Sequence, residues 1–513
     1  MSAVETPEQV GQKQPLEKEW PKSLLSRLVG GVLPVSLGRF LAMVLALLTT
    51  MLVARHLSSE DFGTFILIGV IAAFLTQISS FGMDVTAAKL IASTDNDVYK
   101  GQFINAVITF RLFTIVLVSI VSLIAREAIS ALFGTSLTPG LAVFIPSLFL
   151  LVSLRALLQS ILQGFGLFWR LGLGDFLSSL LNLILVVVVV VVMKQGVLGL
   201  IFATLISELL WNSFLFFSIP TKKRLEWRPE LLKGALKFGF PLQINDILTL
   251  VFQRIDSLLI GALLGPAEIA YYAVARKIPE GLGSIFQGFI SVYFPFMSKL
   301  HAHGEHKKVA QLINNTARVV SFAGISVTLI VLLFGSDLIR VLFSEKYLPS
   351  VNAFVLLMLT LSISFVSNIF GTSLVAAGGS KEPAIINSAH VVTSLVCNFV
   401  FIPQFGIIGA ALAGLVGNLV SNPLNVLFLR RRMVEIRVKN YLKPFLIFGL
   451  CGILFLLFNP IHSAQKALII GSFVLACAFL SVFTVKDLTF VSAELNATIT
   501  KLLRSSRSES AEI

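Results

Sequence analysis

The chain has 513 residues, of which 56% are hydrophobic and only 13% are charged. Soluble domains usually have about 25% charged residues, so the composition excludes an ordinary soluble protein. The net charge of +13 would suit a nucleic-acid partner, unless the basic residues follow a membrane topology.

Apolar blocks of roughly 20 residues recur along the chain, the length that a helix needs to cross about 30 Å of hydrocarbon. Backbone polar groups in lipid must be paired internally, so each block is predicted to be a helix. Alternating ten-residue strands, typical of an outer-membrane barrel, are absent from the sequence. The predicted fold class is an all-α membrane protein with about 14 transmembrane helices. The predicted spans are 28–53, 62–82, 103–125, 141–163, 174–193, 197–219, 238–263, 270–297, 316–343, 350–376, 383–402, 405–429, 443–459 and 466–485.

The basic residues follow the predicted topology. With the N-terminus in the cytoplasm, the cytoplasmic segments hold 27 Lys and Arg residues and the external loops hold 5. Cytoplasmic loops of membrane proteins carry such an excess of Lys and Arg. The basic excess is therefore topological and argues against nucleic acid as a partner, and both termini are predicted to be cytoplasmic.

The first half of the chain resembles the second at an offset of 207 residues. Pro34 aligns with Pro241, Leu41 with Leu248, and Asp61 with Glu268. An even number of crossings separates the repeats, which predicts two parallel six-helix halves related by a pseudo-two-fold axis along the membrane normal, followed by two further helices. The predicted regions are a cytoplasmic tail (1–27), the first half (28–219), a basic linker (220–237), the second half (238–429), a basic loop with two helices (430–485) and a cytoplasmic tail (486–513).

The sequence argues against an enzyme. Loops are no longer than about 20 residues, which leaves no room for a catalytic or nucleotide-binding domain, and the G-x-x-x-x-G-K-[ST] phosphate-binding loop is absent. Cys397, Cys451 and Cys477 lie in apolar blocks and predict neither a disulfide framework nor a zinc site. The first apolar block lacks a cleavage site and is interpreted as a retained helix. No cofactor is expected, and the run His301, His303 and His306 is a weak metal candidate.

Several cationic side chains fall inside predicted spans, where each costs at least about 2.5–3.5 kcal/mol on insertion scales. Such residues are expected to face a wet cavity or a partner, not lipid. Four acids accompany them, namely Glu208, Asp246, Asp256 and Glu280, which leaves an excess of about two positive charges and predicts a cationic cavity. The candidate substrate-binding residues are Arg39, Arg111, Arg155, Arg254, Arg276 and Lys277.

The seventh predicted span carries a polar stripe. Gln243, Asp246, Thr249, Gln253 and Asp256 are spaced by three or four residues, which places them on one broad helix face. The equivalent face of the first span has Arg39 at the position of Asp246, so the two stripes are expected to face each other across the central space. We regard this stripe and Glu208 as candidates for polar contacts or ion coupling.

Purely structural roles are open alternatives for these charges. Arg39 and Asp246 could form a buried structural pair, and Glu208 could be a protonated core acid. Arg276 and Lys277 could extend to the membrane interface instead of a cavity.

Four segments resemble the oligosaccharide flippase family (Wzx-type polysaccharide biosynthesis and export proteins) of the multidrug/oligosaccharidyl-lipid/polysaccharide exporter superfamily. They are LGRFLAMVLALLTTMLVARHLSSEDFGTF (37–65), FGFPLQINDILTLVFQRIDSLLIGALLGPAEIAYYAVARKI (238–278), AAGGSKEPAIIN (376–387) and FGIIGAALAGLVGNLV (405–420). The resemblance covers residues 25 to about 435. It implies translocation of an undecaprenyl-pyrophosphate-linked oligosaccharide across the bacterial inner membrane for surface polysaccharide biosynthesis.

The expected partners follow from this resemblance and from the charges. They are the lipid-linked oligosaccharide, membrane lipids, a polysaccharide polymerase and chain-length regulator, and H⁺ or Na⁺ as a coupling ion. Pyrophosphate suits a cationic cavity because arginine binds phosphate oxygens bidentately. The alternatives are a lipid II-type flippase, a multidrug or cation exporter of the same superfamily, a membrane-embedded polymerase or ligase, and a non-transporting scaffold of an export complex.

Overall fold

The computed structural model describes residues 22–479, apart from 95, 134–136, 222–223, 303, 380, 433 and 459–462. The described part of the chain consists of helices joined by short loops, which confirms the predicted all-α fold class. The predicted tail 486–513 and residues 1–21 of the predicted N-terminal tail lie outside the described residues. The helices are α1 (Lys22–His56), α2 (Ser59–Ser80), α3 (Met83–Ala92), α4 (Asp97–Ile124), α5 (Arg126–Phe133), α6 (Pro139–Ala142), α7 (Phe144–Gly164), α8 (Phe168–Val186), the π-helical η2 (Val187–Val192), α9 (Gly196–Ser218), α10 (Pro229–Leu263), α11 (Pro266–Ala302), α12 (His306–Leu342), the 3-10 helix η3 (Glu345–Ser350), α13 (Val351–Ala376), α14 (Lys381–Phe405), α15 (Ile407–Arg431), α16 (Val438–Phe458) and α17 (Ser463–Phe479).

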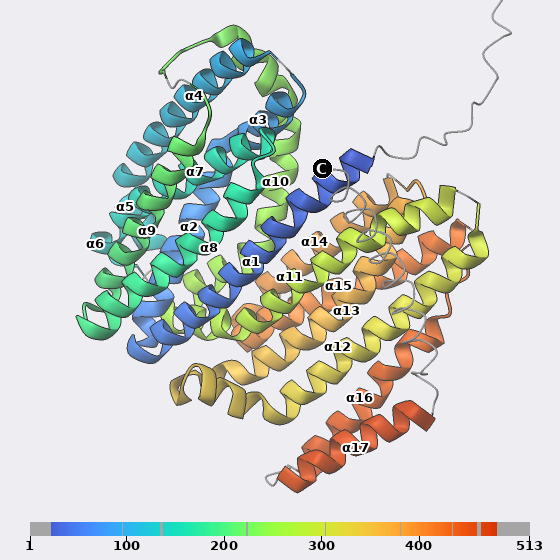
Figure 1. The fold of residues 1–513 in the computed structure, drawn as a ribbon. Coiled ribbons are helices and arrows are strands. Elements are labelled where there is room, and N and C mark those ends of the chain that lie inside the picture. Colours follow the sequence, from blue (N-terminus) through green and yellow to red (C-terminus); the bar gives the residue numbers. More distant parts are fainter. Residues whose placement is uncertain are drawn as a thin grey trace, which may run out of the picture.

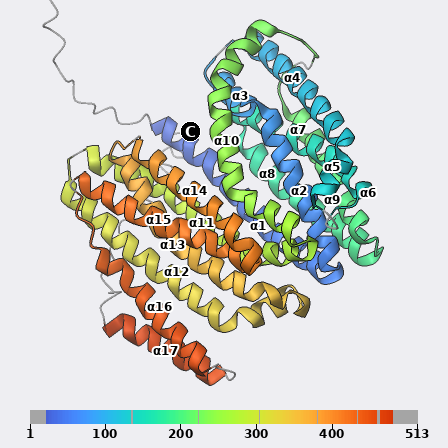
Figure 2. The same cartoon turned by 180° about the vertical axis from the view of Figure 1, so that it is seen from behind.

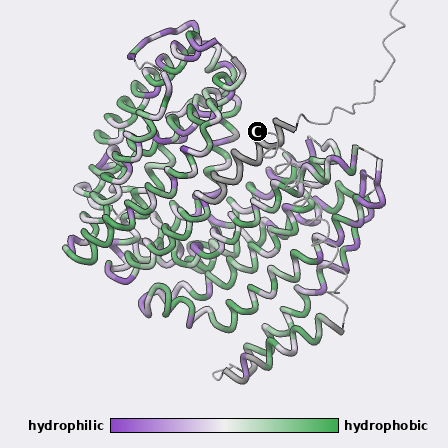
Figure 3. The backbone as a smooth tube through the Cα atoms, viewed as in Figure 1, coloured by the Kyte–Doolittle hydropathy of each residue, from purple (hydrophilic) through white to green (hydrophobic). Residues whose placement is uncertain are grey.

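A helix lies at each of the fourteen predicted spans, and the chain is a multi-pass membrane protein. Among the described residues, 11 helices are long and apolar enough to cross a membrane. Helices α10 and α11 have more interior charge, and α17 contributes a shorter apolar stretch, Leu468–Cys477. Figure 3 shows hydrophobic residues along the lengths of the helices and hydrophilic ones gathered toward their ends.

The helices gather into two lobes (Figures 1 and 2). We define the N-lobe as α1–α9 and the C-lobe as α11–α17. Helix α1 runs along the side of the N-lobe that faces the C-lobe and packs against α8, while α16 and α17 lie at the far edge of the C-lobe. Helix α10 bridges the lobes, because it packs against α2 and α3 of the N-lobe and against α14 of the C-lobe.

Two helices end at positions that agree with the predicted repeat. Helix α1 ends at His56 and helix α10 ends at Leu263, 207 positions apart. Arg39 and Asp246 lie equally far before these ends, about 26 Å at 1.5 Å per residue, so both side chains start deep within the molecule's thickness.

Local signals set the turns between the helices. The Ser58 hydroxyl accepts a hydrogen bond from the Asp61 amide at 3.0 Å and so caps α2. Between α2 and α3, Gly82 has a φ of 69°, and a β-carbon there would lie 2.1 Å from the carbonyl oxygen of Gly239. Glycine is therefore required at this turn both for the left-handed backbone and for the close passage of α10.

We call the end of the molecule that contains residues 57–58, 264–265 and 343–350 the sealed end. A single hydrophobic core there includes Leu57 and Phe62 of the N-lobe together with Tyr272, Phe343 and Tyr347 of the C-lobe. The ring of Tyr347 contacts the edges of Phe62 and Tyr271. Apolar burial shared between lobes holds them together at this end.

At the sealed end, one cation from each lobe donates hydrogen bonds to backbone carbonyl oxygens of the other lobe. Arg55, at the end of α1, donates to the carbonyl oxygens of Leu342, at 3.3 Å, and Val341, where α12 ends. Lys346 donates to the carbonyl oxygens of Arg55, at 3.4 Å, and Leu57, just where α1 ends. Each lobe thus supplies a positive charge to the negative end of a helix dipole in the other lobe.

The opposite end, which we call the basic end, has two separate cores. One consists of N-lobe residues such as Phe103 and Leu158, with Leu232 of α10, and the other consists of C-lobe residues such as Phe286 and Ile313. The basic loops that contain Arg224, Arg228 and the run Arg430–Arg432 lie at this end. The lobes therefore share a core at one end and have independent cores at the other.

Candidate functional site

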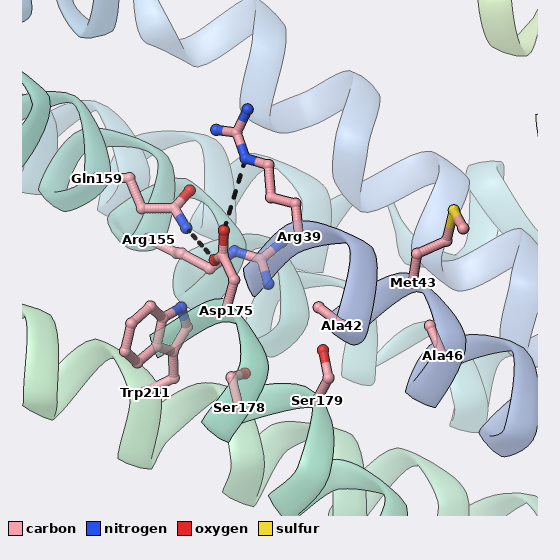
Figure 4. A pocket seen from close by; sticks show the side chains of 10 residues that line it. All are labelled: Arg39, Ala42, Met43, Ala46, Arg155, Gln159, Asp175, Ser178, Ser179 and Trp211. Carbon is pink, nitrogen blue, oxygen red and sulfur yellow. Dashed lines mark hydrogen bonds and ion pairs between the residues drawn. The ribbon is translucent and has the colours of Figure 1, made fainter. Parts of the chain in front are cut away.

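A charged pocket of about 400 Å³ opens halfway along α1. Helices α1, α7, α8 and α9 each contribute to its wall (Figure 4). Its small and polar residues come from two faces packed against each other, Ala42 and Ala46 on α1 and Ser178 and Ser179 on α8. The complete lining is Arg39, Ala42, Met43, Ala46, Arg155, Gln159, Asp175, Ser178, Ser179 and Trp211.

Charges of alternating sign cross this pocket. The Arg39 guanidinium lies 3.8 Å from Asp175, whose other oxygen accepts a hydrogen bond from the Gln159 amide at 2.9 Å. Arg155 also interacts electrostatically with Asp175, and it donates to Glu208 at 2.5 Å. Figure 4 shows the Asp175 carboxylate pointing toward Arg39, Gln159 and Arg155. The pocket therefore presents two guanidinium groups whose present partners are carboxylates.

The pocket lies close to the C-lobe. A side chain added at Gly281 of α11 would reach the Met43 sulfur at 3.6 Å, and Met43 lines the pocket. Gly281 directly follows Glu280, which is part of a second charged cluster. The two charged regions therefore lie on the facing sides of the two lobes, with α1 between them.

The second cluster joins α10 to α11. Arg276 donates to Asp256 at 2.7 Å and contacts Glu280 at 3.2 Å, and Arg254 lies 3.5 Å from Glu280. Lys277 interacts electrostatically with Glu280 and Arg254. Arg276 lies ten residues into α11, about 15 Å from its start, and its half-buried side chain is paired with carboxylates.

Tyr272 completes this cluster from one turn away. Its hydroxyl donates to Asp256 at 2.7 Å, on the carboxylate oxygen that also accepts from Arg276. The other oxygen of Asp256 accepts from the Ser257 amide at 2.7 Å. Asp256 is thus held by hydrogen bonds on both oxygens, whereas the side chains of Arg254 and Glu280 are each 42% exposed.

The structure corrects the expectation for Arg111, whose side chain is fully buried. It donates to the Ser79 hydroxyl at 3.0 Å and to the Thr76 carbonyl oxygen at 3.2 Å, and it lies 3.8 Å from Asp84. A side chain without exposed surface cannot touch a substrate. Arg111 instead binds α4 to α2 and α3, and we exclude it from the binding residues.

The polar stripe of α10 is divided between different surroundings. Gln243 is buried against the α2–α3 turn, where its amide bonds to the Gln77 carbonyl, the Ser80 hydroxyl and the Gly82 amide. Thr249 and Gln253 are exposed. Asp246 interacts electrostatically with Asp84, whereas Arg39 lies 3.8 Å from Asp175. Helix α10 packs against α2 and α3 of the N-lobe.

The predicted excess of about two positive charges is also not found. Asp84 and Asp175, which the sequence analysis did not count, each lie 3.8 Å from a candidate arginine. With these two acids counted, the six candidate cations are matched by six acids among the described residues. Asp175 was missed because it stood at the edge of the predicted span, which starts at residue 174, whereas α8 starts at Phe168 and places Asp175 well inside the helix. A polar stripe at helical spacing, Asp175, Ser178, Ser179 and Asn182, is the sequence signal that identifies this face.

The metal candidate receives no support. Among the described residues, no group of three or more His, Cys, Asp or Glu side chains is placed to hold a metal ion. His301 and His306 lie with their rings 5.8 Å apart, and His303 is outside the described residues.

A family model described as "Polysaccharide biosynthesis protein" matches residues 52–352 of this chain, more than half of its length. Among curated proteins, the chain is 22% identical over 388 residues to a protein of Haloferax volcanii named "Probable low-salt glycan biosynthesis flippase Agl15". This match covers 73% of this chain and 78% of that protein. A Shigella flexneri protein named "Putative O-antigen transporter" is 23% identical over 222 residues, 43% of this chain and 52% of its own length. The chain thus matches only about half of this second relative.

Solved structures show the same fold. A lipid II flippase, MurJ, in an inward closed conformation matches with a TM-score of 0.70 and 19% identity, over 90% of this chain and 99% of that one. An inward-facing multidrug transporter of the MATE family matches with a TM-score of 0.60 and 17% identity, over 79% of this chain and 99% of that one. At these identities the likeness concerns the arrangement of the helices.

Proposed function

The chain belongs to the polysaccharide biosynthesis protein family, as a Wzx-type member of the multidrug/oligosaccharidyl-lipid/polysaccharide exporter superfamily, and on that premise we propose that it exports a polyprenyl-pyrophosphate-linked oligosaccharide. It is a transporter, not an enzyme. The oligosaccharide crosses between the lobes while the lipid tail stays in the bilayer. The relatives named as a glycan flippase and an O-antigen transporter support this substrate class.

One observation carries the proposal, namely two arginines in a pocket at the middle of the molecule. Arg39 and Arg155 line the pocket, and the Arg39 side chain is 61% exposed. Arginine presents a planar set of donors that matches phosphate oxygens. The pyrophosphate binds at these two guanidinium groups, with Arg254 and Lys277 of the second cluster available across α1.

The two ends of the molecule support alternating access. The lobes share a core at the sealed end and have separate cores at the basic end. By the positive-inside rule the basic end faces the cytoplasm, so this conformation receives substrate from inside the cell. Transport then requires the sealed end to separate and the basic end to close, as the two lobes rock around the central pocket.

The membrane potential favours export of such a substrate. A pyrophosphate diester carries about two negative charges, and moving each outward gains about 2.3 kcal/mol per 100 mV. A polar glycan cannot cross hydrocarbon unaided, so the protein's contribution is a hydrated path and a charge-matched site.

The test replaces Arg39 by Gln in a strain whose surface polysaccharide depends on this protein. We expect polysaccharide output to fall at least tenfold with normal protein levels in the membrane, because the pyrophosphate loses its most exposed cation. Arg126→Gln is the matched control, since Arg126 is exposed at the sealed end, far from the pocket. Normal output from Arg39→Gln would contradict the proposal.

Complementation experiments distinguish an oligosaccharide flippase from a lipid II flippase, the alternative with the most similar substrate. A cell depleted of its lipid II flippase and supplied with this protein should not regain growth, whereas a cell lacking its oligosaccharide flippase should regain surface polysaccharide. Rescue of growth alone would assign the protein to peptidoglycan synthesis.

A further inference from the structure

We propose that Asp175 is an internal counter-ion that competes with the anionic substrate for Arg39 and Arg155, so that anion binding is linked to protonation of Asp175. This inference rests on the proposed function and identifies what regulates affinity at the same pocket. It gives a role to a carboxylate that the charge pattern of the sequence did not reveal.

Three charged side chains from neighbouring helices surround Asp175. Helix α8 packs against α1, α7, α9 and η2. Among the described residues, the charged side chains that face Asp175 are Arg39 from α1, Arg155 from α7 and Glu208 from α9, while η2 contains only valines. Two guanidinium groups and two carboxylates alternate, so every charge of this set has an opposite neighbour.

The two ion pairs in this set differ in strength. Arg155 and Glu208 are 2.5 Å apart, and the Glu208 side chain is only 12% exposed. Arg39 and Asp175 are 3.8 Å apart, and the Arg39 side chain is mostly exposed. Short, buried ion pairs are costly to break, whereas long, exposed ones contribute little. The Arg39–Asp175 contact is therefore the one that an incoming anion replaces.

Replacement leaves Asp175 beside a second anion. A carboxylate near another negative charge, in a partly buried pocket, is driven toward its neutral form. Gln159 stays within hydrogen-bonding distance and can bond to the protonated group as well. Binding of the anion and binding of the proton are then mutually favourable, and by linkage each raises the affinity for the other.

The experiment measures binding to the purified full-length protein in lipid nanodiscs. The probe is a short-chain dialkyl pyrophosphate, whose charge is constant across the neutral range, and the corresponding uncharged dialkyl ether serves as the blank. Calorimetric titration at about pH 5.5 and about pH 8 compares anion binding under conditions that favour and disfavour protonation of a carboxylate beside the bound anion. For the wild-type chain we expect affinity to fall about tenfold between these values.

Asp175→Asn separates competition from structure. Asparagine has the same shape and can still pair with Gln159, but it cannot compete as an anion. This variant should bind the probe about tenfold more tightly than wild type at about pH 8, with little dependence on pH. Asp337→Asn is the matched control, because Asp337 pairs with Lys466 and Arg340 away from the pocket and should leave both values unchanged.

Glu208→Gln provides a second variant in case Asp175→Asn is poorly folded. It frees Arg155 from its carboxylate and should also strengthen binding at about pH 8, by a smaller factor, because Asp175 still competes. Unchanged or weaker binding by Asp175→Asn, with wild-type binding independent of pH, would overturn the inference and assign Asp175 a positioning role.

These outcomes distinguish the inference from the function on which it rests. If wild type binds the probe and Arg39→Gln does not, the pocket binds pyrophosphate whatever Asp175 does. If neither wild type nor Asp175→Asn binds the probe, and wild type fails to restore surface polysaccharide, both the inference and the proposed function are wrong.

Discussion

At the sealed end, side chains of both lobes share one apolar core, and each lobe places a cation on a helix end of the other. At the basic end, each lobe has a core of its own, and Gln243 of the bridging helix α10 makes polar contacts with the turn between α2 and α3. The sealed end thus combines a shared apolar core with two cations that cap helix ends across the lobes. Under the proposed alternating-access mechanism, these contacts have to open in every cycle.

The largest expected effect on surface polysaccharide output comes from preventing contact between the lobes at the sealed end. A β-carbon at Gly63 would lie 1.7 Å from the carbonyl oxygen of Pro266, the first residue of α11. Gly63→Leu should therefore keep the lobes apart and lower surface polysaccharide output more than tenfold. Gly69→Leu, on the same helix, is the control, because a β-carbon at Gly69 has no neighbour within 4 Å. Equal output from both variants would show that sealing is not required.

The next effect concerns the polar contact of α10 at the other end. Gln243→Leu leaves the buried Gly82 amide and the Gln77 carbonyl without this partner. An unsatisfied buried polar group costs about 1–3 kcal/mol, so the free energy of unfolding in detergent should fall by about that amount. Gln311→Leu, at an exposed position of α12, should change it much less. An unchanged free energy of unfolding in Gln243→Leu would mean that the other contacts of α10 hold it in place.

A smaller effect is expected from the caps of the sealed end. Each cation at a helix C-terminus contributes about 0.3–1 kcal/mol. In a chain without its native cysteines, a cysteine at the fully buried Ala270 should react with a maleimide about two- to fivefold faster after Arg55→Gln or Lys346→Gln. Arg126→Gln should leave the rate unchanged. Slower labelling in the cap variants would reverse the assignment of these residues as closing contacts.

The smallest effect is a pH dependence in the loop that joins the halves. A hydrogen bond from Arg228 lowers the pKa of Glu226 from its ordinary value of 4.5, and Asn105 of α4 adds a second one. Because the pKa of Glu226 is depressed in the folded chain, the stabilisation that its hydrogen bonds give to this loop is fully present above the ordinary pKa. It is lost as pH falls through the folded-state pKa of Glu226. Neighbouring Trp227 packs on Phe110 and Phe113.

Trp227 fluorescence measures this dependence. The emission, taken as the difference from Trp227→Phe, should shift toward the solvent-exposed value below about pH 4.5. Glu226→Gln should show the shifted emission at neutral pH. Glu230→Gln, an exposed acid in the first turn of α10, should behave as wild type. A pH response that survives Glu226→Gln would assign it to another group.

Sequence reasoning predicted most of the fold and less of the site. Arg155, Glu208, Arg276 and Asp256 were all identified as interior charges, and the structure brings them together in two ion pairs. Arg111 was identified as interior but not as fully buried. Asp84 and Asp175 were missed, because Asp84 lies on the short helix α3 between predicted spans and Asp175 stood at the very edge of a predicted span.

By itself, the sequence determined the all-α multi-pass fold, and it predicted the repeat of 207 residues with which the ends of α1 and α10 agree. Membrane thickness and hydropathy act on each segment separately, so the transmembrane segments can be predicted from the amino-acid sequence alone. Only the tertiary structure decided that Arg39 meets Asp175, and that Gln243 is buried against the turn between α2 and α3. Such pairings depend on how each helix is rotated and on which neighbour it packs against, and these properties exist only once the helices have assembled.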